Sequence, residues 1–175
     1  MLIYDEVQTG VGRTGEWFFA GSEAGGGVVP DVVTLAKALG SGVPVGACLV
    51  SEAIASQIKE NDLGTTFGGG MLAMAAVTAT IEAIEEDHML ENVRRVEAYL
   101  RSRLREVEHV VAVHGLGFLL GVEFADGAAP IHKSLLERKI ITGTSSNPKV
   151  LRLLPPLCLQ EEHVDMFVLA MDLHE

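Results

Sequence analysis

Residues 3–19 read IYDEVQTGVGRTGEWFF and join the end of an apolar strand to a glycine-rich turn. The glycines of this turn form a literal G-x-G-x-x-G pattern, which also occurs in dinucleotide-binding folds. Such a site needs the last glycine to open a helix, because the helix amino-terminus holds the pyrophosphate. Here Gly15 is followed by aromatic residues and then by three glycines at 25–27, without helical spacing of apolar residues. We therefore expect a loop after Asp5 and no dinucleotide site.

Composition places the chain among globular proteins. Its 175 residues are 48% hydrophobic and carry a formal net charge of −11, which argues against nucleic acid or an anionic membrane as a general partner. No apolar run reaches the roughly 18 residues of a membrane helix. The two cysteines, Cys48 and Cys158, lack C-x-x-C spacing and lie among apolar residues, so we expect reduced core thiols in a cytoplasmic protein.

The first half of the chain alternates short apolar runs with glycine loops, as buried strands and their connections do. Ser51 is placed to cap a short helix. The expected strands are 2–4, 32–35 and 46–50, and the expected helices are 51–59 and 71–86.

The second half reads as an α+β segment. Its first helix, expected over 89–107, carries Val93, Val96, Leu100 and Leu104 on one face. The remaining expected strands are 110–114, 119–124, 140–142 and 150–153, and the remaining expected helices are 131–138 and 161–174. We place a domain boundary between 1–87, where glycine loops and strand ends favour ligand binding, and 88–175, a smaller domain.

Two residues of the first half carry candidate chemistry. Asp5 stands at the carboxyl end of a strand, where ligands bind in α/β sheets. Lys37 lies in an apolar stretch, where it either extends to the surface or serves as a neutral nucleophile for a Schiff base. A carboxylate, a lysine and the Gly/Thr loop at 64–70 together fit pyridoxal phosphate (PLP), whose ring nitrogen, aldehyde and phosphate need such partners.

Histidine and serine patterns indicate no other site. The six histidines form neither H-x-x-x-H nor H-E-x-x-H, so no metal site is expected. No Ser-His-Asp set can be assembled either.

Five stretches together resemble the class III, or acetylornithine-type, aminotransferases of PLP fold type I, in order and spacing across essentially the whole chain. They are IYDEVQTGVGRTGEWFF (3–19), PDVVTLAKALGSGVPVGACLV (30–50), LGTTFGGG (63–70), HGLGFLLGVEF (114–124) and VLRLLPPL (150–157).

The resemblance implies a role for each matching site residue. Asp5 would pair with the PLP pyridinium nitrogen, and Gln8 would bond the ring's phenolic oxygen. Lys37 would form the Schiff base and move the proton. Thr66 would bind the PLP phosphate of a neighbouring subunit, which implies a homodimer with shared sites. Arg152 would take the substrate α-carboxylate through its planar guanidinium.

The resemblance also implies a fold and a reaction. The chain would be the C-terminal half of a fold type I enzyme, α/β in class, with part of the large domain followed by a small α+β domain. It would move an amino group from N-acetylornithine or a similar ω-amine to 2-oxoglutarate by a ping-pong mechanism in the cytoplasm. Gly68–Met71 replace the family's usual GGNP. Another class III transaminase, an aminomutase and an inactive remnant stay open as alternatives.

Overall fold

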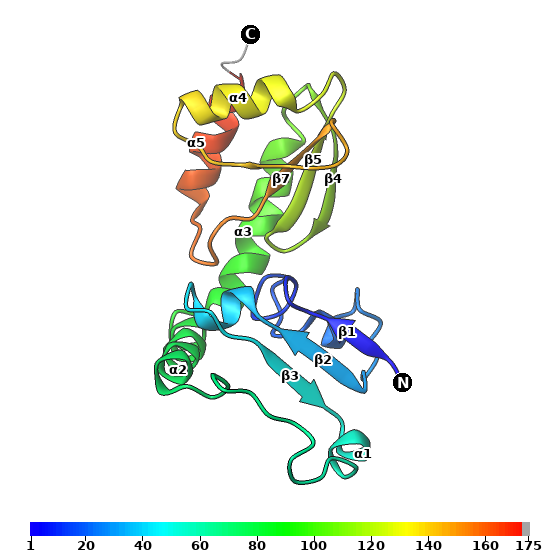
Figure 1. Cartoon of the computed structure of the whole chain (residues 1–175). Coiled ribbons are helices and arrows are strands. Elements are labelled where there is room, and N and C mark those ends of the chain that lie inside the picture. The colour runs from blue at the N-terminus through cyan, green and yellow to red at the C-terminus, as the bar shows by residue number, and fades with distance from the viewer. Residues whose placement is uncertain (173–175) are drawn as a thin grey trace. The chain divides into compact units, whose positions relative to one another are not determined.

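A computed structural model describes residues 1–172 of the chain. These residues form two compact units, which we call unit 1, Met1–His88, and unit 2, which begins at Met89 (Figure 1). Each unit has a sheet of its own, and each is described by itself.

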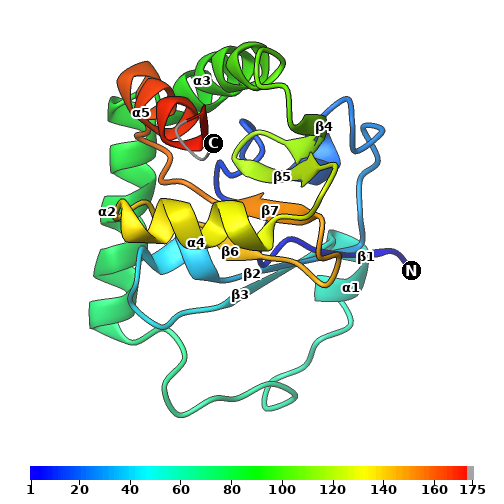
Figure 2. The ribbon, with the colours of Figure 1, turned by 90° about the horizontal axis from the view of Figure 1, so that it is seen from above.

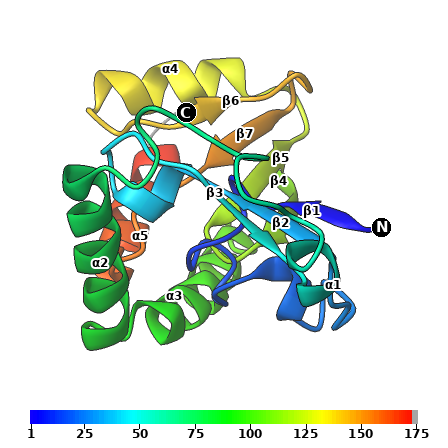
Figure 3. The same cartoon turned by 60° about the horizontal axis from the view of Figure 1, so that its bottom comes forward.

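Unit 1 is built on a three-stranded sheet in the order β1-β2-β3 (Figure 3). Strand β1 (Ile3–Asp5) runs parallel to β2 (Val32–Leu35), and β3 (Ala47–Val50) pairs with β2 in the antiparallel direction. All three strands lie within one residue of their expected positions. Because β1 and β2 are parallel, their carboxyl ends lie at the same edge of the sheet.

The helices of unit 1 differ in length and in their agreement with the expected bounds. Helix α2 (Met71–Glu86) has the expected bounds and contacts η2 (Lys37–Gly40), a single 3-10 turn. Helix α1 covers only Glu52–Ala55, so the expectation of a helix to residue 59 is wrong. The expected side-chain cap is also wrong, because Ser51 contributes its carbonyl to α1 and no side-chain bond. None of the α1 residues is buried, so packing does not extend the helix.

Unit 1 leaves much of its apolar surface uncovered. Phe67, Met71 and Leu72 expose between 77% and 91% of their surface. Phe67 lies in the long segment between α1 and α2, which is visible as an extended loop in Figure 1. Met71 and Leu72 lie in the first turn of α2. The buried apolar residues of unit 1 are Val11, Ala20, Leu35, Leu39 and Ile84.

Unit 2 contains an antiparallel sheet in the order β4-β5-β7-β6, with α3 and α5 in contact and α4 next to α5 and β6 (Figure 2). Its elements are α3 (Met89–Leu104), β4 (Val110–Leu116), β5 (Leu119–Phe124), α4 (Ala129–Glu137), β6 (Gly143–Thr144), β7 (Val150–Leu153) and α5 (Glu161–Asp172).

A continuous apolar core fills unit 2. Helix α3 contributes the expected stripe at three- and four-residue spacing. Strands β5 and β7 face it with alternate residues, as a half-buried sheet requires. Helix α5 adds Val164, Phe167 and Val168 at helical spacing. The fully buried large side chains are Phe118, Phe124, Leu104, Leu135, Leu151, Val93, Val96, Val122 and Val164.

Further expectations need correction. Helix α3 ends at Leu104 rather than 107, where the chain turns toward β4. The strand expected over 140–142 is wrong, because the segment that pairs with β7 is Gly143–Thr144. Both cysteines are free but exposed, so Cys48 and Cys158 are not core thiols. The part of the last helix expected beyond residue 172 lies outside the described residues.

Candidate functional site

Asp5 is the last residue of β1 and lies exposed at the carboxyl end of the parallel pair. Its Oδ1 accepts hydrogen bonds from the Thr34 hydroxyl and the Val7 amide, each at 3.1 Å. Both bonds use one carboxylate oxygen and fix the side chain from two sides. Within residues 1–172 both of these contacts fall on Oδ1, so Oδ2 can accept a hydrogen bond from a ligand.

Lys37 follows β2 and reaches the loop that follows β1. Its Nζ donates a hydrogen bond to Gln8 Oε1 at 3.0 Å. Lys37 begins η2 with a φ of 44°, a left-handed conformation that costs a non-glycine residue free energy. Of the two alternatives for a lysine in this apolar stretch, the structure shows the exposed one: Lys37 extends to the surface. The left-handed turn therefore presents the amine outward beside Gln8.

The loop after β1 begins with a buried carboxylate, that of Glu6, which is only 2% exposed. Glu6 is not among the functional residues that the sequence pattern predicts. Side chains alternate between the two faces of a strand, so an exposed Asp5 indicates that the next side chain, that of Glu6, lies on the opposite face. This alternation was the available signal for a buried Glu6. The loop then runs into η1 (Phe19–Gly21), a single 3-10 turn, so Gly15 opens no helix.

Thr66 lies exposed in the segment between α1 and α2. Within residues 1–172, no hydrogen bond joins Thr66 to Asp5, Gln8 or Lys37. The structure of one chain therefore does not bring Thr66 together with the other residues expected at the PLP site.

Arg152 belongs to unit 2, in the middle of β7 between β5 and β6. Its side chain is exposed and lines a cavity of about 780 Å³. Apolar residues from β7 and α5, among them Leu153, Val164 and Phe167, form much of the wall. A guanidinium beside an apolar wall suits a ligand with a carboxylate at one end and a carbon chain behind it.

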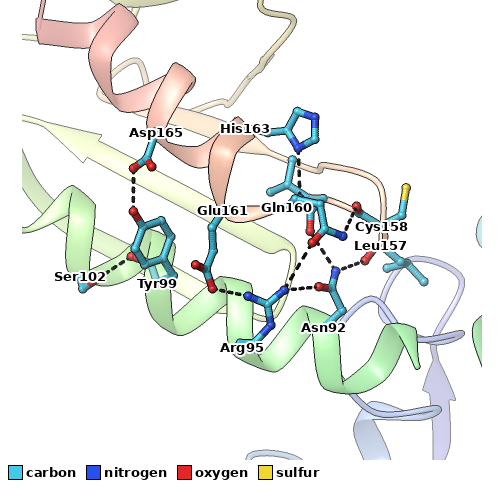
Figure 4. Close-up of polar contacts among 11 residues, drawn as sticks. Asn92, Arg95, Tyr99, Ser102, Leu157, Cys158, Gln160, Glu161, His163 and Asp165 are labelled. Carbon is cyan, nitrogen blue, oxygen red and sulfur yellow. Dashed lines mark hydrogen bonds and ion pairs between the residues drawn. The ribbon is translucent and has the colours of Figure 1, made fainter. Parts of the chain in front are cut away.

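The connection after Arg152 is anchored by α3 (Figure 4). Asn92 Nδ2 donates to the carbonyls of Leu157 and Leu159 at 2.8 and 2.9 Å. Arg95 Nη2 donates to Asn92 Oδ1 at 2.8 Å and Arg95 Nη1 pairs with Glu161, which fixes the orientation of the amide. One side chain thus holds the segment that links β7 to α5.

The polar side chains of Asp5, Gln8 and Lys37 in unit 1 fit PLP chemically. A primary amine, an amide and a carboxylate with a free oxygen are the groups that the aldehyde, the ring oxygen and the ring nitrogen require. All three side chains come from the ends of the parallel pair β1–β2 and the turns that follow.

Metal-binding clusters and membrane-spanning helices are both absent from the described part of the chain. No group of three or more His, Cys, Asp or Glu residues between 1 and 172 is arranged to hold a metal ion. Over the same residues, no helix has the length and apolar character that crossing a membrane requires.

Comparison with known proteins gives one family. Residues 1–173 match the family model "Aminotransferase class-III". The chain is 43% identical over 169 residues to the acetylornithine aminotransferase of Archaeoglobus fulgidus, covering 96% of this chain and 43% of that protein. It therefore spans less than half the length of this curated relative.

Solved structures agree with this family. The ornithine delta-aminotransferase of Plasmodium falciparum superposes with a TM-score of 0.83 at 32% identity, covering 99% of this chain and 46% of that one. A transaminase from the marine bacterium Virgibacillus gives a TM-score of 0.88 at 28% identity, with 98% and 44% coverage. The expected fold class, α/β of PLP fold type I, is confirmed. By sequence and by fold, the chain belongs to the class III aminotransferase family.

Proposed function

We propose that this chain carries the lysine-bearing half of a PLP-dependent aminotransferase site. The reaction transfers an amino group from N-acetylornithine or a similar ω-amine to 2-oxoglutarate. The observation that carries the proposal is the 3.0 Å hydrogen bond from Lys37 Nζ to Gln8 Oε1, at the same edge of the parallel pair as the strand-end carboxylate of Asp5. The name of the Archaeoglobus relative supports the donor class.

Each residue of unit 1 has a separate task in this proposal. PLP, when bound, supplies an electron sink for the bond that breaks beside the substrate nitrogen. Asp5 keeps a proton on the ring nitrogen, because a carboxylate stabilises an adjacent cation. Lys37 holds the cofactor through its Nζ and moves a proton at that atom. Gln8 orients the ring and the amine together.

Thr66 and Arg152 are proposed to complete the site from outside unit 1. Thr66 is exposed and forms no hydrogen bond with Asp5, Gln8 or Lys37 in the described residues, so it suits a contact with the PLP phosphate of a second copy of the chain. The active assembly would then be a homodimer. Arg152 suits the substrate α-carboxylate because bidentate recognition of a carboxylate is the task of a guanidinium. Unit 1 is then part of the cofactor domain, and unit 2 is the small domain. The free thiols agree with a cytoplasmic protein.

A second candidate is another class III reaction, such as transamination of free ornithine. The fold likeness to the Plasmodium ornithine delta-aminotransferase favours it. An aminomutase of the same family is the remaining enzymatic alternative.

The test uses the 175-residue chain with added PLP. Borohydride reduction is expected to fix PLP covalently to the peptide that contains Lys37, which mass spectrometry locates. Lys37→Ala should abolish this adduct, whereas Lys59→Ala, another exposed lysine of unit 1, should leave it unchanged. Absence of an adduct on Lys37 would contradict the proposal. Amino transfer from N-acetylornithine and from ornithine to 2-oxoglutarate, measured side by side, then separates the two candidate donors.

A further inference from the structure

We propose that Glu6 is a positioning residue for the Lys37 site, acting through the loop that presents Gln8. The inference rests on the proposed function for its catalytic meaning, although the contacts that carry it belong to the chain itself. Glu6 would not touch the cofactor. Its buried carboxylate holds the loop in the conformation in which Gln8 accepts from Lys37.

The carboxylate of Glu6 is bonded at both oxygens. Oε2 accepts the Phe19 amide at 2.7 Å and the Thr9 hydroxyl at 3.2 Å, and Oε1 accepts the Ala20 amide at 2.9 Å. The two amides belong to the start of η1, more than ten residues further along the chain. A buried carboxylate is tolerated when such donors satisfy it, so each bond also holds its donor segment in place.

The main chain of Glu6 fastens the same loop at its base. Its N–H donates to the Thr34 carbonyl at 3.0 Å and extends the pairing of β1 with β2 by one residue. Its carbonyl accepts the Gly10 amide, also at 3.0 Å. Gln8 therefore lies at the centre of a turn whose two ends are joined through Glu6.

Gly10 shows how closely this turn is packed. A Cβ at Gly10 would lie 2.8 Å from Leu35 Cδ2 and 3.0 Å from the Glu6 carbonyl oxygen. The turn thus rests on the last residue of β2, two residues before Lys37. Loosening the Glu6 carboxylate frees the loop from η1, and Gln8 then loses its fixed place opposite Nζ.

Glu6→Gln tests this with little change in shape. A glutamine presents an NH2 group where one of the two backbone amides now donates, so one bond is lost and two donors face each other. Thr9→Val removes the hydroxyl that donates to Glu6 Oε2 and leaves the carboxylate and both backbone amides in place. It serves as the milder second variant if Glu6→Gln does not fold. Glu23→Gln, an exposed acid on the segment after η1, is the matched control for loss of charge.

The first readout needs no cofactor. Lys37 and Lys59 of the full chain compete for trace acetic anhydride, and their labelling ratio reports the environment of the Lys37 amine. Glu6→Gln should shift this ratio and should accelerate hydrogen exchange at the Phe19 and Ala20 amides, each by about tenfold for one lost charged hydrogen bond. Thr9→Val should shift both in the same direction by less, and Glu23→Gln should shift neither.

The second readout is the concentration of PLP that half-saturates borohydride trapping on Lys37. Glu6→Gln should raise it by about tenfold in the wild-type background and have little effect once Gln8 is alanine, because both changes act on one contact. A wild-type labelling ratio in folded Glu6→Gln, or an equal effect of Glu6→Gln with and without Gln8, would overturn the inference. Failure of the wild-type chain to trap PLP would instead contradict the proposed function, since the labelling ratio tests Glu6 without PLP.

Discussion

Lys37 Nζ donates to Gln8 Oε1 at 3.0 Å, across 29 positions of sequence. The contact joins the turn after β2 to the loop after β1, and both turns lie at one edge of a parallel pair. Replacing the acceptor by a carboxylate tests what the amide does there. Gln8→Glu should stabilise the ammonium form of Lys37 and move PLP trapping to higher pH, because only the neutral amine attacks an aldehyde.

The measurement for Gln8→Glu is the initial rate of borohydride-trapped PLP as a function of pH. Gln8→Ala is the matched variant without charge, and its pH profile should keep the wild-type midpoint. An unchanged profile in Gln8→Glu would show that residue 8 does not face the amine in solution.

Asp5→Asn separates charge from geometry. An asparagine keeps an oxygen for Thr34 and Val7 but gives up the negative charge that would hold a proton on the cofactor ring. We expect unchanged folding and a fall in kcat on the order of a hundredfold, as for loss of one preorganised electrostatic partner. Asp31→Asn, at the opposite end of the strand pair, should leave kcat within a factor of two, about the scatter of a surface charge change. Equal losses in both variants would assign the effect to stability.

Asn92→Ala should destabilise unit 2 by about 1–3 kcal/mol, because the carbonyls of Leu157 and Leu159 lose a shared donor. Urea unfolding followed by circular dichroism measures the change. Ser102→Ala removes an exposed hydroxyl bond within α3 and should cost no more than about 0.5 kcal/mol. Equal midpoints for the two variants would refute the anchoring role of Asn92.

Gly115→Ala tests the β4–β5 hairpin. Gly115 has a φ of 96°, and a Cβ there would clash with the Leu119 carbonyl oxygen. Gly127→Ala is the matched control, since Gly127 has a φ of 110° and its nearest atom to a Cβ is the Pro148 oxygen at 3.8 Å. Both changes carry the backbone penalty of about 1–2 kcal/mol, and Gly115→Ala should cost about 1–3 kcal/mol more through the clash. Thermal unfolding of the two variants decides this.

Tyr99 gives a prediction in alkaline solution. The hydrogen bond that its hydroxyl donates to Asp165 raises the pKa of Tyr99 above the ordinary value, with burial and the negative charge of Asp165 acting in the same direction. A raised pKa means that the neutral phenol stabilises the folded state below about pH 10, and that this contribution is lost as the pH rises through the pKa of the folded protein.

Tyrosinate absorbance tests the assignment, because the chain has only two tyrosines. The titration step that disappears in Tyr99→Phe should lie above about pH 10. Urea midpoints of wild type and Tyr99→Phe should differ at neutral pH and converge above that step. A step at the ordinary value would contradict a persistent bond to Asp165.

The amino-acid sequence alone predicted the features that depend on local pattern. The stripe of Val93, Val96, Leu100 and Leu104 has helical spacing, and α3 buries all four. The family, the fold class and the strand-end position of Asp5 also followed from sequence, because contiguous motifs carry them. Segments without a strong period, such as 140–144, could not be placed, since pairing with β7 decides which residues become β6.

Only the tertiary structure decided how the functional groups meet. The apolar stretch around Lys37 left its exposure open, and the left-handed turn at η2 exposes its amine beside Gln8. The role of Glu6 could not be predicted from sequence, because two of the three donors to its carboxylate are backbone amides of the distant residues 19 and 20. Contacts between distant segments leave no local signature, because they form only when strand pairing and packing compensate the entropy of closing the intervening loops.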